Sequence, residues 1–286
     1  LCRRLGIADQ LIGTNPNSRR TYVVRDGVMH PVPEGFLLLA PTKIWPFITS
    51  RLFSWPAKLR MAMDYILPAR RHGADGDESL ADFVRRRFGR EALDRVAQPM
   101  VSGIYTADPE NLSLRATMPR FLEMEEKYGS IIKAMRAGRK AQAASGASGT
   151  DSGARYSLFV SFRDGMSTLT DTLAERIGRE RLATGARVTR LERVVDGWRV
   201  HITGREPLEA DAVILACPAY ASAEIVRELD APLADELSGI AYASSATMSL
   251  AYRAEQVGRT IDGFGFVVPA IEARTLIAVT VSSTKF

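Results

Sequence analysis

The side chains that most often perform chemistry are few in this sequence and lie far apart along it. The three histidines, His30, His72 and His201, lack metal-ligand spacing. The two cysteines, Cys2 and Cys217, can form neither a disulfide framework nor a metal knuckle. The carboxylates show no pairing that would serve as a general acid and base, and there is no phosphate-binding glycine loop or nucleophile elbow. We therefore expect no metal site, and we assign no catalytic side chain.

Residues 98–113, QPMVSGIYTADPENLS, have the most distinctive composition in the chain. They are too apolar for a surface loop and too rich in Pro and Gly for a helix. Pro99 lacks a backbone donor, and Gly103 lets the chain approach a neighbour closely or adopt a positive φ. The stretch is predicted to be an apolar loop between two helices. Two roles stay open, the wall of a pocket or a buried connector, and the residues alone favour the connector.

Positive charge is concentrated in the first quarter of the chain. The 286 residues are 46% hydrophobic and 25% charged, which is typical of one large globular domain or two smaller ones. The net charge is +5, but residues 1–72 alone hold 11 Lys and Arg against 4 Asp and Glu. A nucleic acid, an anionic membrane surface or an anionic substrate could each use such a region. No apolar run approaches the 18 residues that span a bilayer, and no signal-peptide pattern is present.

The elements that must position any site follow two different patterns. Residues 18–30 predict two strands joined by an Asp26-Gly27 turn. Residues 31–67 interleave aromatic and cationic side chains between prolines, as in short amphipathic helices. These helices are either an interfacial membrane element or an ordinary subdomain whose aromatic residues form its own core. Nucleic acid is disfavoured because the aromatic residues do not lie on a strand platform.

The remaining elements are predicted from periodicity and turn residues. Helices are expected at 79–89, 91–96, 115–128, 131–144, 166–177 and 219–229, and a low-complexity loop at 142–153. Strands are expected at 156–162, 187–195, 198–203, 208–216, 248–253, 265–268 and 275–281. The continuous apolar run at 212–216 is typical of a strand that is buried on both faces.

Several stretches in fixed order resemble the oxygen-dependent protoporphyrinogen oxidase family, within the FAD-dependent amine-oxidase-like superfamily. They are RTYVVRDG at 20–27 with PVP at 31–33, FVRRRFG at 83–89, PMVSGIYTADP at 99–109 with LS at 112–113, FRDGMSTL at 162–169, VILACP at 213–218, GFGFVVP at 263–269 and SSTKF at 282–286. The resemblance implies a mixed α/β fold of α+β type. It would be a fragment of a two-dinucleotide-binding-type FAD/NAD(P)-binding fold, with a mixed-sheet substrate domain and an inserted helical, membrane-associated domain.

The layout of that family implies five segments. Residues 1–16 would end an N-terminal segment, 17–131 would form the helical membrane-associated domain, and 132–155 would be a linker and a segment of the substrate domain. Residues 156–224 would be part of the FAD-binding domain, and 225–286 a truncated substrate domain. The chain resembles an internal fragment without the N-terminal and C-terminal FAD-binding segments. We therefore expect this chain alone to bind FAD poorly and to be inactive.

The resemblance implies oxidation of protoporphyrinogen IX to protoporphyrin IX in heme biosynthesis. Hydride would pass to FAD, and O₂ would be the terminal acceptor, so the chemistry would belong to the cofactor. Three residues would face the substrate. Arg20 would bind a propionate, unless Thr21 is the true equivalent. Gly103 would lie beside a pyrrole ring, and Phe264 would stack on the macrocycle. The alternatives are an exposed charge for Arg20 and sheet core for Phe264.

Five residues would contact the cofactor. Arg187 and Val188 match a strand start whose backbone meets the adenine end of FAD. Ala216, Cys217 and Pro218 match a strand end beside the cofactor, where open α/β sheets bind ligands. The simpler interpretation of Cys217 is a small apolar filler.

Three rival functions stay open. One is oxidation of coproporphyrinogen III to coproporphyrin III, and another is a different flavin oxidase or desaturase. The third is a non-catalytic module that binds a membrane or a partner. The expected partners are the porphyrinogen, O₂ and a membrane surface bound peripherally, without nucleic acid, and a homodimer is left open. The expected location is cytoplasmic, at the inner face of the cytoplasmic membrane.

Overall fold

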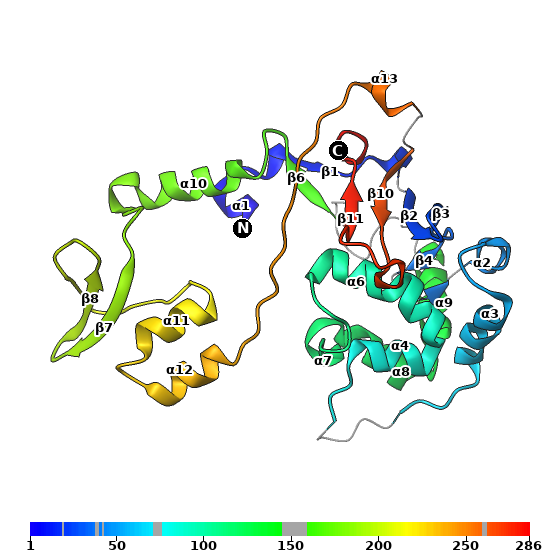
Figure 1. Cartoon of the computed structure of the whole chain (residues 1–286), viewed down its shortest axis with the longest axis horizontal. Coiled ribbons are helices and arrows are strands. Elements are labelled where there is room, and N and C mark those ends of the chain that lie inside the picture. The colour runs from blue at the N-terminus through cyan, green and yellow to red at the C-terminus, as the bar shows by residue number, and fades with distance from the viewer. Residues whose placement is uncertain (19, 38–39, 42, 71–75, 145–158, 259–261) are drawn as a thin grey trace. The chain divides into compact units, whose positions relative to one another are not determined.

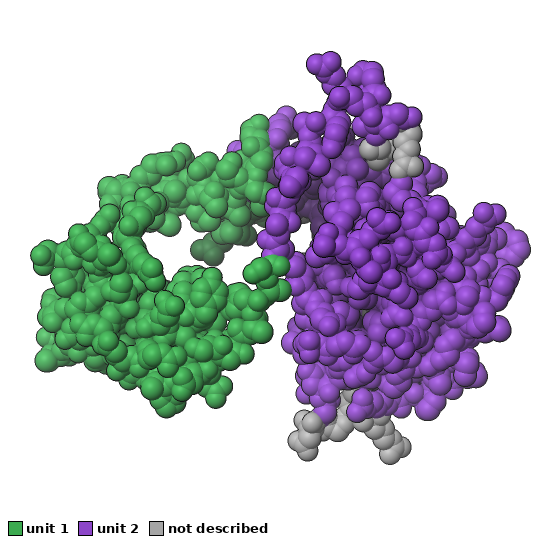
Figure 2. Space-filling view, in the orientation of Figure 1, with its two compact units in different colours: residues 1–8, 164–244 green, residues 9–163, 245–286 purple. Residues whose placement is uncertain are grey.

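The computed structural model describes the chain except residues 19, 38–39, 42, 71–75, 145–158 and 259–261 (Figure 1). The described residues divide into two compact units (Figure 2). Unit 1 consists of residues 1–8 and 164–244, and unit 2 of residues 9–163 and 245–286.

A four-stranded sheet forms the centre of unit 2, in the order β11-β10-β2-β3. Its strands are β2 (Arg20–Arg25), β3 (Val28–Pro31), β10 (Gly263–Val267) and β11 (Ala278–Thr280). β10 runs parallel to β2, and the other two pairs are antiparallel. Asp26 and Gly27 both have positive φ, 51° and 75°, so the predicted two-residue hairpin turn is confirmed. The strands expected near 265–268 and 275–281 are confirmed as well.

Helices cover the face of this sheet that carries Val23 and Val267. Both side chains belong to the main hydrophobic core, together with residues such as Phe83, Leu114 and Ile131. The helical segments of unit 2 are α2 (Ile44–Thr49), α3 (Trp55–Ala62), η3 (Met63–Tyr65), α4 (Leu80–Phe88), α5 (Arg90–Ala92), η4 (Leu93–Ala97), α6 (Gln98–Tyr105), α7 (Leu114–Thr117), α8 (Pro119–Tyr128), α9 (Ile131–Ala144), α13 (Ala254–Val257) and α14 (Ser282–Lys285), with short turns η2 (Pro16–Ser18) and η6 (Ala270–Glu272). Two small ribbons complete the unit, β1 (Leu11–Gly13) with β6 (Val160–Phe162) and β4 (Phe36–Leu37) with β5 (Ala40–Pro41).

The helix expected at 79–89 is confirmed as α4, and it is capped at both ends. Ser79 accepts a hydrogen bond from the Asp82 amide at 3.0 Å, and Gly89 ends the helix with a φ of 91°. The low-complexity loop lies mostly outside the described residues, as does the first part of the strand expected at 156–162.

The prediction of a loop at 98–105 is wrong, because these residues form helix α6. Pro99 stands in the first turn of α6, where a missing amide costs little. The preceding residues 93–97 have the wider π-helical geometry of η4, which is often found near functional sites. Gly103 does not have a positive φ, so its role is to leave the surface of a helix without a side chain.

Unit 1 contains a three-stranded antiparallel sheet, β7 (Val188–Val194), β8 (Gly197–Ile202) and β9 (Leu208–Ala210). Its helical segments are α1 (Cys2–Leu5), α10 (Ser167–Ile177), η5 (Arg179–Arg181), α11 (Ala219–Val226) and α12 (Ala231–Ser238), with η1 (Ala8–Gln10) at its border with unit 2. Leu191 and Val200 of the sheet pack with Ile225 of α11. The predicted hairpin is confirmed, although Gly197 is its first strand residue and the turn is Val195-Asp196.

The strand expected at 208–216 is present only in its first part, as β9, and the strand expected at 248–253 is absent from the described structure. Residues 212–216 lie outside any described strand and leave Ile214 91% exposed, and residues 248–253 likewise leave Met248 82% exposed. A strand that is buried on both faces needs hydrogen-bonded neighbours and a layer on each side. The described residues supply neither at these positions. Among the helices described, none is long and apolar enough to cross a bilayer.

Candidate functional site

Arg20, Tyr22 and Asp262 form a hydrogen-bonded group where β2 and β10 begin. Nη1 of Arg20 donates to Oδ2 of Asp262 at 2.6 Å, and the Tyr22 hydroxyl donates to Oδ1 of the same carboxylate, also at 2.6 Å. The Arg20 side chain is 69% exposed and that of Asp262 48%. A guanidinium has five N–H donors, so the exposed Arg20 keeps donors accessible to an anion from solvent.

Two glycines of β10 allow this arrangement. Gly263 lies opposite Arg20, and a Cβ at position 263 would be 2.5 Å from the Arg20 carbonyl oxygen. Gly265 has a φ of 139°, and a Cβ there would be 1.9 Å from the Val279 carbonyl oxygen. Because neither position has room for a side chain, glycine lets β10 lie between β2 and β11 and brings Asp262 to Arg20.

The protonation states of this group follow from its hydrogen bonds. The bond from Tyr22 is the largest influence that lowers the pKa of Asp262, and the bond from Arg20 acts in the same direction. The carboxylate in turn raises the pKa of Tyr22 and of Arg20. At neutral pH Asp262 is therefore ionised, Tyr22 is neutral, and Arg20 and Asp262 cancel in net charge.

Of the two sequence candidates for a propionate ligand, Arg20 is the exposed one. Alternate residues of a strand face opposite sides of the sheet, so Thr21 shares a face with Val23. Val23 is fully buried against the helices, and Thr21 is half-buried. Thr21 therefore belongs to the packed side of β2.

The other two predicted substrate residues lie on elements that adjoin β2. Phe264 is half-buried and lies within the bulge of β10. Gly103 is exposed on α6, and a Cβ there would be in ordinary contact with Val267 of β10, at 3.8 Å from its Cγ1. The structure thus brings Arg20, Phe264 and Gly103 onto three neighbouring elements of unit 2 (Figure 1).

An exposed apolar surface covers the segment from α2 to the end of η3, and we call it the aromatic face. Its members are Ile44, Trp45, Trp55, Leu59, Met63 and Ile66, which are 42–78% exposed. Phe47 and Phe53, by contrast, are buried in the main core. The phenylalanines of residues 31–67 therefore pack inward, as in an ordinary subdomain, whereas the tryptophans are exposed, and the membrane interpretation stays a prediction.

Two cations of this segment support the fold instead of reaching into solvent. Lys58 is only 8% exposed and donates to the carbonyl oxygens of Ile48 and Ser50 at 2.6 and 2.8 Å. Its Nζ also lies 4.6 Å from the centre of the Trp55 ring, a cation–π contact that orients the exposed indole.

Arg60 closes the C-terminal end of α4. Its guanidinium donates to the carbonyl oxygens of residues 85, 86 and 87 at 2.7–3.4 Å, which satisfies acceptors that a helix end leaves open. A Cβ at Gly89 would lie 2.7 Å from Cγ of Arg60, so the glycine makes room for this contact.

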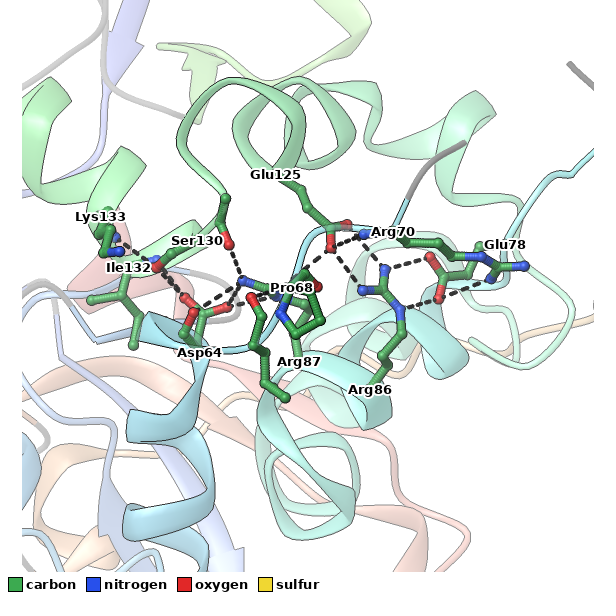
Figure 3. Close-up of polar contacts among 12 residues, drawn as sticks. Asp64, Pro68, Arg70, Glu78, Arg86, Arg87, Glu125, Ser130, Ile132 and Lys133 are labelled. Carbon is green, nitrogen blue, oxygen red and sulfur yellow. Dashed lines mark hydrogen bonds and ion pairs between the residues drawn. The ribbon is translucent and has the colours of Figure 1, made fainter. Parts of the chain in front are cut away.

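A buried ion network ties α4 to its surroundings (Figure 3). Arg87 and Asp64 are both fully buried, with Nε of Arg87 2.7 Å from Oδ1 of Asp64. Oδ2 of Asp64 accepts from the Ser130 hydroxyl at 2.6 Å and from the Ile132 amide at 3.0 Å. The network therefore joins η3, α4 and the start of α9.

The second part of this network centres on Arg86. Its guanidinium donates to Glu78 at 2.8 Å through two nitrogens and to Glu125 at 2.7 and 3.0 Å (Figure 3). Both carboxylates are nearly inaccessible to solvent, and Glu125 also contacts Arg87 at 3.3 Å. These charges are matched within the fold, so this network is structural.

The predicted cofactor residues gather around α11 in unit 1. The Arg187 side chain is 78% exposed and lies 3.6 Å from Glu224 of α11, and Val188 is half-buried at the start of β7. Ala216, Cys217 and Pro218 are exposed just before α11. All five residues are at least partly exposed to solvent.

Two contacts limit what these residues can offer to a ligand. The first amide of α11, from Ala219, already donates to the Tyr242 hydroxyl at 2.8 Å. Cys217 is exposed and lies 3.1 Å from the Ser222 hydroxyl, so it does not act as an apolar filler here. No group of three or more metal-binding side chains occurs among the described residues.

A shallow cavity of about 290 Å³ lies at the other end of β2 from Arg20. It is lined by Arg25, Arg90, Glu91, Asp94, Arg95 and Ile271. Arg95 pairs with Glu272 at 3.0 Å, and Arg25 donates to two backbone carbonyl oxygens. Because these cations are already partnered and no predicted site residue lines the cavity, we place the candidate site at Arg20 instead.

Tyr22 and Asp262 were not predicted as site residues. Asp262 directly precedes the GFGFVVP stretch, and Tyr22 lies within RTYVVRDG. Both stretches are among those that carry the family resemblance. What the sequence does not reveal is that these two stretches become neighbouring parallel strands.

Comparison with known proteins gives consistent results. The family described as flavin containing amine oxidoreductase matches residues 1–272. Coproporphyrinogen III oxidase of Bacillus subtilis is 31% identical over 286 residues, all of this chain and 59% of its own length. Coproporphyrinogen III oxidase of Propionibacterium freudenreichii is 32% identical, again over all of this chain and 57% of its own. Chloroplastic protoporphyrinogen oxidase of Nicotiana tabacum is 28% identical over 98% of this chain and 52% of its own.

The chain thus spans between half and three-fifths of each of these relatives. A solved structure from Exiguobacterium sp. 255-15, described as a candidate protoporphyrinogen oxidase, matches with a TM-score of 0.76 and 22% identity. The match covers 100% of this chain and 58% of that one. It confirms the predicted fold class, a mixed α/β part of an FAD-dependent oxidase fold.

Proposed function

The chain belongs to the flavin containing amine oxidoreductase family, and we propose that it supplies the substrate-binding elements of an enzyme that oxidises a porphyrinogen to a porphyrin. FAD is the cofactor, and when bound it supplies the chemistry by accepting hydride from the reduced macrocycle, with O₂ as the final oxidant. The relatives named above support this reaction because their similarity extends along the whole chain.

The observation that carries the proposal is that Arg20 and Phe264 lie on the adjoining strands β2 and β10, and that Gly103 lies on α6, the helix that packs against β10. A porphyrinogen is a large apolar ring with carboxylate side chains. Arg20 provides an exposed cation for a carboxylate. Phe264, on the adjoining strand, provides an aromatic surface for the ring. Gly103 provides a stretch of helix without a side chain, against which a flat molecule could lie closely.

On the cofactor side, this chain's own residues would do little besides binding and orientation. Arg187 and Val188 would contact the adenine end of FAD, and Ala216, Cys217 and Pro218 the edge nearer the substrate. These residues are exposed in unit 1, so they could contact one side of a large ligand.

Two substrates are candidates. Coproporphyrinogen III has four carboxylates, and two relatives with that activity match the whole chain at 31% and 32% identity. Protoporphyrinogen IX, the substrate first expected from the sequence, has two carboxylates, and a relative with that activity matches at 28%. We propose coproporphyrinogen III first, because the Arg-rich first quarter of the chain suits the more highly charged substrate.

The test is turnover of both porphyrinogens by the natural protein that contains this chain. Each would be supplied with FAD in air, and porphyrin fluorescence would be followed against spontaneous oxidation without protein. We expect faster porphyrin formation with at least one substrate, and a loss of about tenfold or more in kcat/KM for Arg20→Gln. Rates equal to spontaneous oxidation for both substrates would refute the proposal.

We further propose that the aromatic face contacts a membrane surface peripherally, at the cytoplasmic side of the cell membrane. Exposed tryptophans next to cations are typical of helices that lie in a membrane interface. Of the cations Arg51, Lys58 and Arg60, Lys58 and Arg60 serve the fold, so Arg51, which is exposed, is the one suited to lipid headgroups. The domain assignments at 17–131, 156–224 and 225–286 remain part of this proposal.

A further inference from the structure

Asp262 is placed to control how strongly Arg20 attracts a carboxylate. Its Oδ2 lies 2.6 Å from Nη1 of Arg20, so one negative charge adjoins the cation proposed to bind the substrate. This position is built into the fold. The Tyr22 hydroxyl holds the other carboxylate oxygen at 2.6 Å, and Gly263 allows the strand to begin directly against Arg20.

A carboxylate that approaches Arg20 meets both members of this pair. The exposed guanidinium keeps donors for it, but the net charge of Arg20 and Asp262 is zero. Two unit charges about 5 Å apart in water interact weakly. Their interaction changes a binding constant by roughly fourfold. Each additional substrate carboxylate near the pair would be disfavoured by a comparable factor.

We propose that Asp262 is a specificity-determining residue, which offsets the charge of Arg20 and so reduces the preference of the site for a tetracarboxylate macrocycle over a dicarboxylate one. This inference rests on the proposed function, since it assigns Arg20 to a substrate carboxylate. Tyr22 is a positioning residue in this arrangement, because it fixes the carboxylate of Asp262 without reaching the substrate.

The first test is binding of the two porphyrin products, coproporphyrin III and protoporphyrin IX, measured by fluorescence titration. Asp262→Asn keeps oxygen and nitrogen atoms where the carboxylate stood but removes its charge. We expect this variant to bind coproporphyrin III about three- to tenfold more tightly, with a smaller gain for protoporphyrin IX. The gain should shrink as salt is added, because exposed charges are screened.

A matched control separates this local effect from the change in net charge. Glu110→Gln also removes one exposed carboxylate next to an arginine, in this case Arg85 of α4. It should leave the ratio of the two affinities unchanged. A double variant, Arg20→Gln with Asp262→Asn, should lose most of the gain, because the effect acts through Arg20.

The same ratio can be followed in turnover by the natural protein. If Asp262→Asn leaves the ratio of kcat/KM for the two porphyrinogens unchanged, or weakens both equally, the specificity role of Asp262 is refuted while the proposed function stands. If the unmodified protein oxidises neither substrate faster than air alone, the proposed function itself fails. Circular dichroism and urea midpoints of each variant would confirm that it remains folded.

Discussion

Arg87 and Asp64 form a fully buried ion pair in which two guanidinium nitrogens lie 2.5 and 2.7 Å from the same carboxylate oxygen. The other Asp64 oxygen accepts from the Ser130 hydroxyl and the Ile132 amide, and Arg87 also donates to the carbonyl oxygen of Gly129. The pair therefore connects segments that are distant in sequence, and one of them, η3, also carries Met63 of the aromatic face.

Removal of one member of this pair should destabilise unit 2 strongly. We expect Arg87→Met to lower the free energy of unfolding by about 3–5 kcal/mol, because it leaves the charge of Asp64 buried without its partner. Arg85→Met is the matched control, since Arg85 is 41% exposed and pairs only with exposed carboxylates, and it should cost at most about 1 kcal/mol. Urea denaturation measures both, and equal losses would contradict the importance of the buried pair.

Glu125 should make stability depend on pH in the acidic range. Burial opposes its ionisation, but hydrogen bonds from Arg86 and the Arg70 amide outweigh burial, so its pKa lies below its ordinary value of 4.5. When folding lowers the pKa of a carboxyl group, the ionised form of that group stabilises the fold. This stabilisation is fully present above the pKa of the unfolded state, and it is lost as the pH falls through the pKa of the folded state.

Accordingly, the stability difference between the natural protein and Glu125→Gln should be largest near neutral pH and should shrink as the pH falls below about 4.5. Urea midpoints over this range measure it. Glu126→Gln, an exposed neighbour on the same helix, should show no such trend. A difference for Glu125→Gln that stays constant with pH would contradict the assignment.

Gly265 should not tolerate even alanine. A Cβ at this position would lie 1.9 Å from the Val279 carbonyl oxygen at a φ of 139°, so β10 and β11 would have to separate. We expect Gly265→Ala to cost more than about 2 kcal/mol of stability. Gly138→Ala, on the exposed side of α9 with open space around it, should instead stabilise by about 0.5–1 kcal/mol.

Gly103 should tolerate alanine better than leucine. A Cβ there meets Val267 at an ordinary 3.8 Å, so Gly103→Ala should leave the fold intact and should impair kinetics less than leucine does. Gly103→Leu would extend into the space proposed for the ring, and it should raise KM about tenfold or abolish turnover while FAD stays bound. Normal kinetics for the leucine variant would make α6 a simple connector.

The aromatic face should account for membrane binding. We expect Trp45→Ser with Trp55→Ser to reduce co-flotation with anionic lipid vesicles by about tenfold or more, because buried apolar area drives such binding. Arg51→Gln should weaken binding less, and mainly at low salt. Tyr252→Ser, an exposed aromatic residue outside this face, is the control. Binding that is unaffected by the double tryptophan change would exclude the face as the contact.

Features that depend on neighbours in sequence could be predicted well. The Asp26-Gly27 hairpin and the caps at Ser79 and Gly89 follow from local backbone preferences, and the structure has all three. Helix α6 does not follow from composition, because Pro and Gly ordinarily argue against a helix. Pro99 is in the first turn, where proline is tolerated, and Gly103 faces outward.

Features that depend on distant residues could not be predicted in the same way. The apolar run at 212–216 has the composition of a buried strand, but only neighbouring strands would make it one. Arg20 was recognised from its sequence context, whereas its partner Asp262 is far along the chain and meets it only through the parallel pairing of β2 and β10. The run of arginines at 85–87 looks like one basic patch, yet Arg85 pairs with exposed carboxylates, whereas Arg86 and Arg87 pair with buried ones.

The contact between Arg60 and the end of α4 has a consequence for how this region can evolve. Arg60 binds main-chain carbonyl oxygens, so the identity of the side chains at 85–87 does not affect it. It does depend on the absence of a side chain at Gly89, whose Cβ would overlap Arg60. Positions 60 and 89 should therefore covary among related sequences, with glycine kept wherever arginine is kept, whichever side chains occupy 85–87.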